Sequence, residues 1–181
     1  MPTVVTHAAV ALGLGRALGL ASRRPLLLWA LSAGASAVPD LDVVAWPLGI
    51  PYGTLWAHRG ISHSLAFAVV AGIILSVGFH RRLGLRPGWL AAYFALVTAS
   101  HGLLDALTNG GPGVAFFAPF DDTRYFVPWR PVLVSPIGFR FFSRWGLEVI
   151  QSELVWIWLP LGVALAAIEL ARRARRGRVT A

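Results

Sequence analysis

The chain alternates between long apolar stretches and short segments that contain most of its charged residues. Apolar runs of about 18 residues or more are typical of helices that cross a bilayer, because such a helix matches the hydrocarbon thickness. We therefore expect an all-α fold, a polytopic membrane bundle in which residues 1–181 form a single membrane-embedded domain. The pattern predicts about five apolar helices, at roughly 3–20, 26–46, 61–79, 87–107 and 152–171.

One long stretch, about residues 108–142, interrupts this pattern between the fourth and fifth predicted helices. It is rich in glycine, proline, aromatic residues and arginine, which predicts an extramembrane loop rather than a helix. Tryptophan and tyrosine favour the headgroup level of a bilayer, and arginine reaches that level with its long side chain. We expect this loop to cover one end of the bundle.

Composition supports the membrane interpretation and excludes several classes of site. Apolar residues make up 56% of the chain and charged residues 13%, whereas soluble domains have about 25% charged residues. There is no cysteine, so disulfides and thiolate metal sites are excluded. The net charge is +8, but the arginines lie in loops between apolar runs and form no basic domain. We therefore expect this chain to lie in a lipid bilayer. We expect it to bind no nucleic acid and to need no obligate protein partner.

The arginines also predict the orientation of the helices. Short arginine-rich loops remain in the cytoplasm, so five spans place the N-terminus outside and the C-terminus, with a basic tail at 172–181, inside. The clusters that carry this argument follow the first helix, separate the third from the fourth, and follow the fifth: Arg16, Arg23 and Arg24; Arg81, Arg82 and Arg86; Arg172, Arg173, Arg175, Arg176 and Arg178.

Imidazoles and carboxylates gather at the opposite, outer face in this topology. His101 and Asp105 are four residues apart and lie on one face of a helix, where both can bind one ion. Ionisable groups at membrane depth usually face the bundle interior and mark function. A metal would offset the cost of burying them. The candidate ligands come from four separate segments and are His7, Asp40, Asp42, His58, His63, His101 and Asp105.

The identity and number of the metal ions follow only in part from these residues. Carboxylates and imidazoles without sulfur suit zinc, manganese, iron, magnesium or nickel. Seven ligands exceed the needs of one tetrahedral zinc, so one hypothesis is a two-metal site in which an aspartate bridges the ions and a water is activated. Asp40 and Asp42 cannot share a helix face, so we expect one to bind metal and the other to orient a ligand or cap a helix. Which of His58 and His63 binds directly is left open.

Several other polar residues have two interpretations. Arg124 and Arg130 could hold an anionic substrate above the metal, or could pair with Asp121 or Asp122. The candidate catalytic residues are Asp42, Arg59, Arg124 and Arg130. Ser62 is a reasonable N-cap of the third helix, and Thr108 and Asn109 are candidates for orienting ligands. Glu148 and Glu153 could complete the site or stabilise a helix start. His80 is excluded from the site because it lies at the cytoplasmic end.

The ordered motifs resemble the YdjM-like family of LexA-regulated, inner-membrane-associated proteins, which are classed as metal-dependent hydrolases. The resemblance spans nearly the whole chain and implies a hydrolase in the bacterial inner membrane. It is carried by "TH" (Thr6, His7), "PDLD" (39–42), "HRGISHS" (58–64), "SHGLLDALTNGG" (100–111) and "PF…RYFVPWRP…VSPIG" (119–138).

The ligand order is also similar to that of the zinc-dependent phospholipase C and P1 nuclease group, which implies zinc, as one or two ions, and phosphoester hydrolysis. The similarity implies that Asp40 or Asp42, His58 or His63, His101 and Asp105 hold one metal, and that His7 with a bridging Asp105 starts a second. No later His…His-x-x-x-Glu segment is present, so a third site is not expected.

These observations together predict a membrane-bound hydrolase that cleaves a phosphoester of a lipid or lipid-linked substrate with metal-activated water. An alternative is a non-catalytic metal-binding or transport protein, but the inner halves of the last three predicted helices contain almost no ionisable groups. Two further alternatives are haem held by His63 and His101, which leaves the aspartates unexplained, and a purely structural membrane protein.

Overall fold

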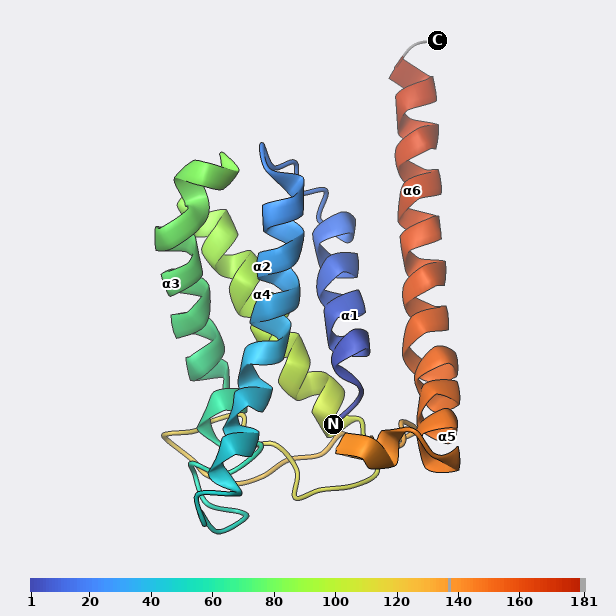
Figure 1. Cartoon of the computed structure of the whole chain (residues 1–181). Coiled ribbons are helices and arrows are strands. Elements are labelled where there is room, and N and C mark those ends of the chain that lie inside the picture. Colours follow the sequence, from blue (N-terminus) through green and yellow to red (C-terminus); the bar gives the residue numbers. More distant parts are fainter. Residues whose placement is uncertain (137, 180–181) are drawn as a thin grey trace.

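The computed structural model describes residues 1–136 and 138–179, and these residues form an all-helical bundle without β-strands. The all-α prediction is therefore confirmed for this part of the chain, and each of the five predicted apolar segments contains a helix. Residues 180 and 181 of the predicted basic tail, and residue 137 of the predicted loop, lie outside the described residues. The helices are α1 (Val4–Ala17), α2 (Pro25–Ala37), α3 (Leu65–Leu83), α4 (Pro87–Ala106), α5 (Arg144–Glu153) and α6 (Leu159–Val179) (Figure 1).

Local chemistry explains where several of these helices begin. The Thr3 hydroxyl accepts a hydrogen bond from the Thr6 amide at the start of α1, and the Ser64 hydroxyl accepts one from the Phe67 amide at the start of α3. Proline, whose missing N–H costs nothing at a first helical position, opens α2 and α4. The prediction of Ser62 as the N-cap is wrong, because Ser64 takes that role.

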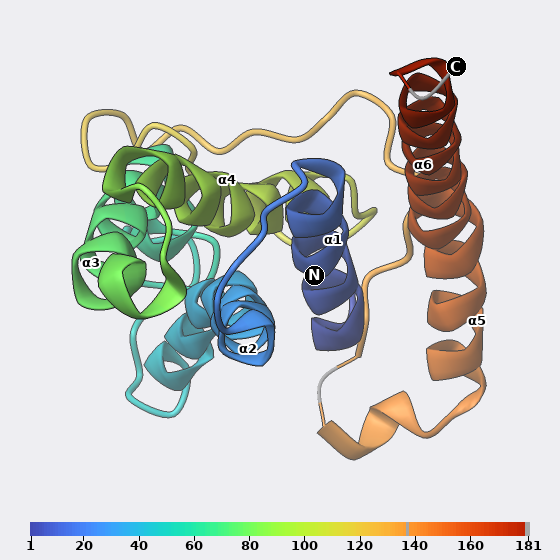
Figure 2. The same cartoon turned by 90° about the horizontal axis from the view of Figure 1, so that it is seen from above.

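The central helix of the bundle is α4, which packs against α1, α2 and α3 (Figure 2). Buried apolar residues of α4, including Phe94 and Val97, form one core with residues of α1, α2 and α3. The buried Tyr93 hydroxyl donates a hydrogen bond to the carbonyl of Ala11 (3.2 Å) and lies 2.7 Å from the Ser32 hydroxyl. These bonds satisfy polar groups that would be costly to leave unpaired in an apolar interior, and they tie three helices together.

The fifth helical segment is continuous but irregular, since a π-helical turn (Leu154–Trp158) joins α5 to α6. Just before this turn the buried Glu153 carboxylate accepts hydrogen bonds from the Thr3 amide (2.5 Å) and the Thr3 hydroxyl (2.7 Å). It also accepts one from the Thr6 hydroxyl (2.6 Å). Glu153 therefore fastens this segment to the start of α1, where its carboxylate accepts the amide of the N-cap residue Thr3.

Within the described part of the chain, three helical segments are long and apolar enough to cross a membrane: Pro25–Ala45, Leu65–Leu83 and Arg144–Gly177. The 14-residue α1 is shorter than a typical span. The crossing of the bilayer by α1 and α4, and the orientation of the whole bundle, stay predictions.

The two long connecting segments and the N-terminus gather at one end of the bundle, and the end of α6 lies beyond the other end (Figure 1). The segments between α2 and α3 and between α4 and α5 lie at the same end as the C-terminal part of α4. This end is therefore where residues distant in sequence can meet.

A substitution at Gly72 tests the contact between α3 and α4. A Cβ atom at Gly72 would lie 2.5 Å from the Ala91 carbonyl oxygen and 2.7 Å from the Ala95 amide nitrogen, so a side chain would push the two helices apart. We expect Gly72→Leu to lower the free energy of unfolding in detergent by about 1–3 kcal/mol. Gly78→Leu on the same helix is the control, because a Cβ there meets nothing within 4 Å. Equal thermal stability of the two variants would contradict this packing.

Candidate metal centre

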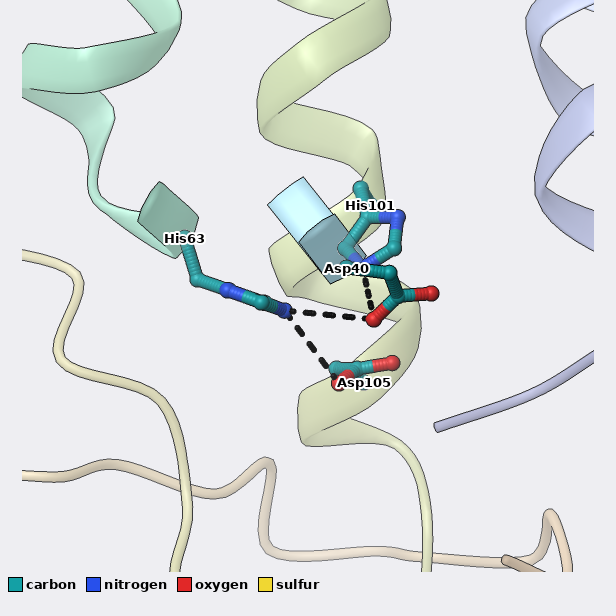
Figure 3. Close-up of side chains that lie close together, drawn as sticks. All are labelled: Asp40, His63, His101 and Asp105. Carbon is teal, nitrogen blue, oxygen red and sulfur yellow. Dashed lines mark ion pairs between the residues drawn. The ribbon is translucent and has the colours of Figure 1, made fainter. Parts of the chain in front are cut away.

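Four side chains from three segments converge at the loop end of the bundle (Figure 3). Asp40 lies on the 3-10 helix η1 (Val38–Ala45), His63 ends the short 3-10 helix η2 (Ile61–His63), and α4 carries His101 and Asp105. Asp40 Oδ1 lies 3.3 Å from His101 Nε2 and 3.8 Å from His63 Nε2. Asp105 Oδ2 lies 3.7 Å from His63 Nε2. One donor atom from each residue lies within 4.8 Å of all the others.

These separations are close to those between ligands of a common ion. Zinc binds imidazole nitrogen and carboxylate oxygen at about 2.0–2.2 Å, which places neighbouring ligands of a tetrahedral site roughly 3.4 Å apart. Three separations of 3.3–3.8 Å are close to this value, and the others lie within 4.8 Å, so the two nitrogen and two oxygen donors would have to move closer together to hold one divalent cation.

Most of the donor atoms are buried without a protein partner, and the exception is Asp105 Oδ2, which accepts a hydrogen bond from Arg59. Among the described residues, His63 Nε2, His101 Nε2, Asp105 Oδ1 and both carboxylate oxygens of Asp40 have no hydrogen-bond partner. A buried polar group without a partner is rare, and an uncompensated buried charge is costly. Since the unpartnered atoms of several residues lie together, the arrangement suits a bound cation.

The other nitrogen of each imidazole is held in place. His101 Nδ1 donates a hydrogen bond to the Ser36 carbonyl (2.6 Å), which holds the ring with Nε2 toward Asp40. His63 Nδ1 lies 3.1 Å from Asp42 Oδ2 and 2.9 Å from the Ser62 hydroxyl. A carbonyl or carboxylate behind a histidine is the usual way in which proteins orient a metal ligand.

Asp42 belongs to a second, overlapping group with His58 and His63. Its carboxylate also lies 2.8 Å from His58 Nδ1, and it accepts hydrogen bonds from the Ser62 hydroxyl (2.5 Å) and the Arg59 amide (3.2 Å). All these contacts occupy the oxygens of Asp42, whereas those of Asp40 have no such bond. The geometry thus separates the two aspartates that the sequence could not distinguish.

His7 lies beside the group rather than within it. Its ring stacks on that of His101 with a centroid distance of 3.8 Å, and its Nε2 lies 3.6 Å from Asp105 Oδ1. Both ring nitrogens are buried, and neither has a hydrogen-bond partner in the part of the chain that the structure describes. His7 is therefore placed to add a ligand on the far side of Asp105.

Arg59 places its guanidinium group next to Asp105 in this site. Its side chain is 1% exposed, and its Nε donates a hydrogen bond to Asp105 Oδ2 at 2.9 Å. The remaining nitrogens donate to the Thr108 hydroxyl (2.9 Å) and the Gly110 carbonyl (2.8 Å). Its backbone has φ +65°, a conformation that is costly for a residue with a side chain and is often found at functional sites.

The other candidate arginines lie further out. Arg124 donates hydrogen bonds to backbone carbonyls that include those of Thr54 (2.9 Å) and His58 (3.2 Å), so it holds the loop that carries His58 and Arg59. The exposed Arg130 stacks over the Phe126 ring at 4.4 Å. Among the described residues, neither forms an ion pair with Asp121 or Asp122, and their contact with substrate stays a prediction.

The remaining sequence candidates fall outside the group. Asn109 accepts a hydrogen bond from the Val134 amide and orders the loop, whereas Thr108 contacts Arg59. Glu148 pairs with Arg144 on the exposed face of α5.

Electrostatics around His63 favour a positive charge. Burial alone would lower the pKa of the imidazole, but hydrogen bonds with the Asp40 and Asp42 carboxylates outweigh it and raise the pKa to about 9. Without a metal, a proton on His63 therefore compensates part of the carboxylate charge. A divalent cation would have to displace that proton.

A cavity of about 190 Å³ lies next to this group. Its lining includes His58, Arg59 and Gly111, and also three aromatic residues from separate segments, Trp46, Tyr52 and Trp145. The candidate metal centre is thus within reach of a small opening with two basic side chains on its wall.

One requirement of the site was not predicted from the sequence. Gly102 follows His101 on α4, and a Cβ atom there would lie 2.9 Å from the His63 carbonyl oxygen. The missing side chain lets the segment of His63 approach α4. A glycine inside an apolar helix, directly after a candidate ligand, is the feature of the sequence that could have indicated this close approach.

Comparison with known proteins identifies relatives over almost the whole chain. The sequence model of the family described as "YdjM inner membrane protein" matches residues 1–175. The Escherichia coli (strain K12) protein "Inner membrane protein YbcI" is 42% identical over 163 residues, which cover 88% of this chain and 92% of the relative. No solved structure matches.

Metal content tests the four-residue group. We expect detergent-purified protein to retain one or two divalent cations per chain. The variants His101→Gln and Asp40→Asn should each lower the metal affinity. The decrease should exceed the roughly 10–100-fold decrease that follows loss of a residue that only hydrogen-bonds to a ligand. His80→Gln is the control, since His80 lies at the other end of α3. Elemental analysis after dialysis makes the measurement. Full metal retention by both site variants would contradict the group as a metal centre.

Proposed function

Since the chain belongs to the YdjM inner membrane protein family, we propose that it is a membrane-bound hydrolase built around a divalent cation held by Asp40, His63, His101 and Asp105. Its substrate is a phosphoester of a lipid or lipid-linked molecule. The observation that carries this proposal is the set of buried donor atoms without partners in these four residues.

The donor set suits zinc, with manganese, iron or magnesium as alternatives, because it combines two imidazoles with two carboxylates and contains no sulfur. When bound, such a cation polarises a phosphoryl oxygen and lowers the pKa of a water molecule. His7, next to the free oxygen of Asp105, is the residue that would extend the site toward a second cation.

Asp42 and His58 are proposed to handle protons. Asp42 holds His58 through Nδ1 at 2.8 Å, which fixes the tautomer and leaves the other ring nitrogen for proton exchange. His58 also lines the cavity beside the metal group, where water and substrate can reach it. Asp42 thus acts by positioning His58 and His63, and direct coordination falls to Asp40.

Arg59 is proposed to bind the substrate's negative charge. It lines the same cavity and is held by Asp105, Thr108 and Gly110, so its position is fixed before any ligand arrives. Arginine is well suited to phosphate because its guanidinium is planar and always charged. Arg124 helps to hold Arg59 in place, because it donates hydrogen bonds to the backbone carbonyls of His58 and Arg59.

The surroundings of the cavity favour a substrate at the membrane surface. Trp46, Tyr52 and Trp145 line its wall and are all substantially exposed. Aromatic side chains of this kind favour the headgroup level of a bilayer, where the ester of a lipid would also lie. A site on the extracytoplasmic face follows from the predicted orientation.

A metal transporter is less well supported. The part of α4 from Pro87 to Ser100 contains no charged residue, so the metal group has no charged continuation through the bundle along this central helix. Transport sites usually lie near the midplane with polar groups on both sides.

Hydrolysis assays test the proposal. The purified full chain, loaded with zinc, should cleave bis(p-nitrophenyl) phosphate or a fluorescent phospholipid, and a chelator should abolish the activity until zinc is restored. We expect His58→Gln to lower kcat by about 10²–10⁴-fold with the metal content unchanged. His80→Gln should leave both unchanged. Metal-loaded protein that is inert on every phosphomonoester and phosphodiester tested would contradict the hydrolase, and an unchanged rate for His58→Gln would contradict the proton-transfer role.

A further inference from the structure

A second concave region lies at the other end of the bundle, between α1, α2 and α6. Figure 1 shows that α6 continues past the end of α1 toward the C-terminus. A cavity of about 460 Å³ occupies this region. It is lined by the end of α1, the turn that follows it, one residue of α2 and one side of α6: Gly15, Arg16, Gly19, Leu20, Ala21, Trp29, Glu169, Arg172 and Arg176.

A second cavity, of about 480 Å³, continues from the first one. The two share Arg16 and Trp29, but the second is otherwise lined by small or apolar residues of α1 and α6, namely Ala9, Leu12, Gly13 and Leu165. The two cavities together form a groove that is basic at one end and apolar along the rest, which we call the α1–α6 groove.

Close contacts define the shape of the α1–α6 groove. A Cβ atom at Gly13 would lie 2.8 Å from a methyl carbon of Leu161, so the two helices touch beyond the apolar part. At the basic end, Arg172 donates hydrogen bonds to the carbonyls of Arg16 (3.0 Å) and Ala17 (2.8 Å), the unpaired end of α1. Trp29 packs against α1 at Gly15, where a Cβ would lie 2.8 Å from its ring.

Charge indicates what the basic end binds. Three arginines and one glutamate line it. Glu169 Oε2 lies 3.3 Å from a terminal guanidinium nitrogen of Arg16, and Glu169 Oε1 lies 3.7 Å from Arg173 Nε. The Arg16 side chain is 65% exposed, so it is available to a ligand that enters from the surface. Arginine binds phosphate through several parallel hydrogen bonds, and basic pockets between membrane helices are typical binding sites for anionic headgroups.

We propose that the α1–α6 groove binds one anionic phospholipid, with its phosphate at Arg16, Arg172 and Arg176 and an acyl chain along Leu12, Gly13 and Leu165. The match rests on both parts of the groove, because a soluble phosphate would leave the apolar part unfilled, and a lining of three arginines and one glutamate favours an anionic headgroup over a neutral one. The site lies at the opposite end of α1 from His7, so it is separate from the candidate metal centre and does not depend on the hydrolase proposal.

Native mass spectrometry of the full chain in detergent tests this site. We expect one phosphatidylglycerol to remain bound per chain under conditions that remove phosphatidylcholine with the same acyl chains. Arg16→Gln should weaken phosphatidylglycerol binding roughly five-fold, the effect expected for one arginine near a headgroup. Arg144→Gln is the matched control, because Arg144 is also an exposed arginine paired with a glutamate, but on α5.

The apolar part needs its own variant. Leu165→Trp should fill the α1–α6 groove and reduce retention of phosphatidylglycerol at least ten-fold, whereas Leu170→Trp, at an exposed position of α6 outside the groove, should not. Equal retention of the two lipids, or equal effects of each variant and its control, would overturn the proposal. Displacement of the lipid by millimolar inorganic phosphate would also overturn it, because the acyl chain would then contribute nothing.

Discussion

The loop end of this protein depends on the cost of burying negative charge in an apolar bundle. Asp40 and Asp105 approach the same two imidazoles, and several of their oxygens lack hydrogen-bond partners among the described residues. Arg59 forms an ion pair with Asp105, and none with Asp40 among the described residues. A bound divalent cation would remove the remaining cost, and the surrounding hydrogen bonds are arranged as they are around a metal: Ser36 behind His101, and Asp42 behind His63.

Unusual backbone features bring these residues together. The 3-10 helix η1 directs both Asp40 and Asp42 toward the histidines, since a helix with three residues per turn sets its side chains differently from an α-helix. Arg59 adopts a left-handed conformation and thereby turns its side chain toward Asp105. Gly102 lets the His63 segment approach α4 closely. The regular helices provide the scaffold, and the irregular segments supply most of the chemistry.

Hydrophobic periodicity was sufficient to predict the all-α fold and the positions of the apolar helices, because each helix is governed mainly by its own residues. The gathering of His7, Asp40, His63, His101 and Asp105 at one end was also predictable, since their places at helix ends followed from the topology. The division of roles between Asp40 and Asp42 was not, because it depends on η1 and on the contacts of Ser62 and His58. The contacts of Glu153 with Thr3 and of Arg59 with Asp105 could not be predicted either, because the two residues of each pair are distant in sequence. The sequence predicts Ser62 as the N-cap, and only the backbone shows that Ser64 takes this role.

The central claim is that one ion joins Asp40, His63, His101 and Asp105. Anomalous diffraction from crystals of the zinc-loaded protein, recorded on both sides of the zinc absorption edge, tests it most directly. The account predicts an anomalous peak about 2.0–2.2 Å from the Nε2 atoms of both histidines and from one oxygen of each aspartate. Absence of zinc density between these four side chains, with the imidazoles and carboxylates bonded to one another or to water instead, would contradict it.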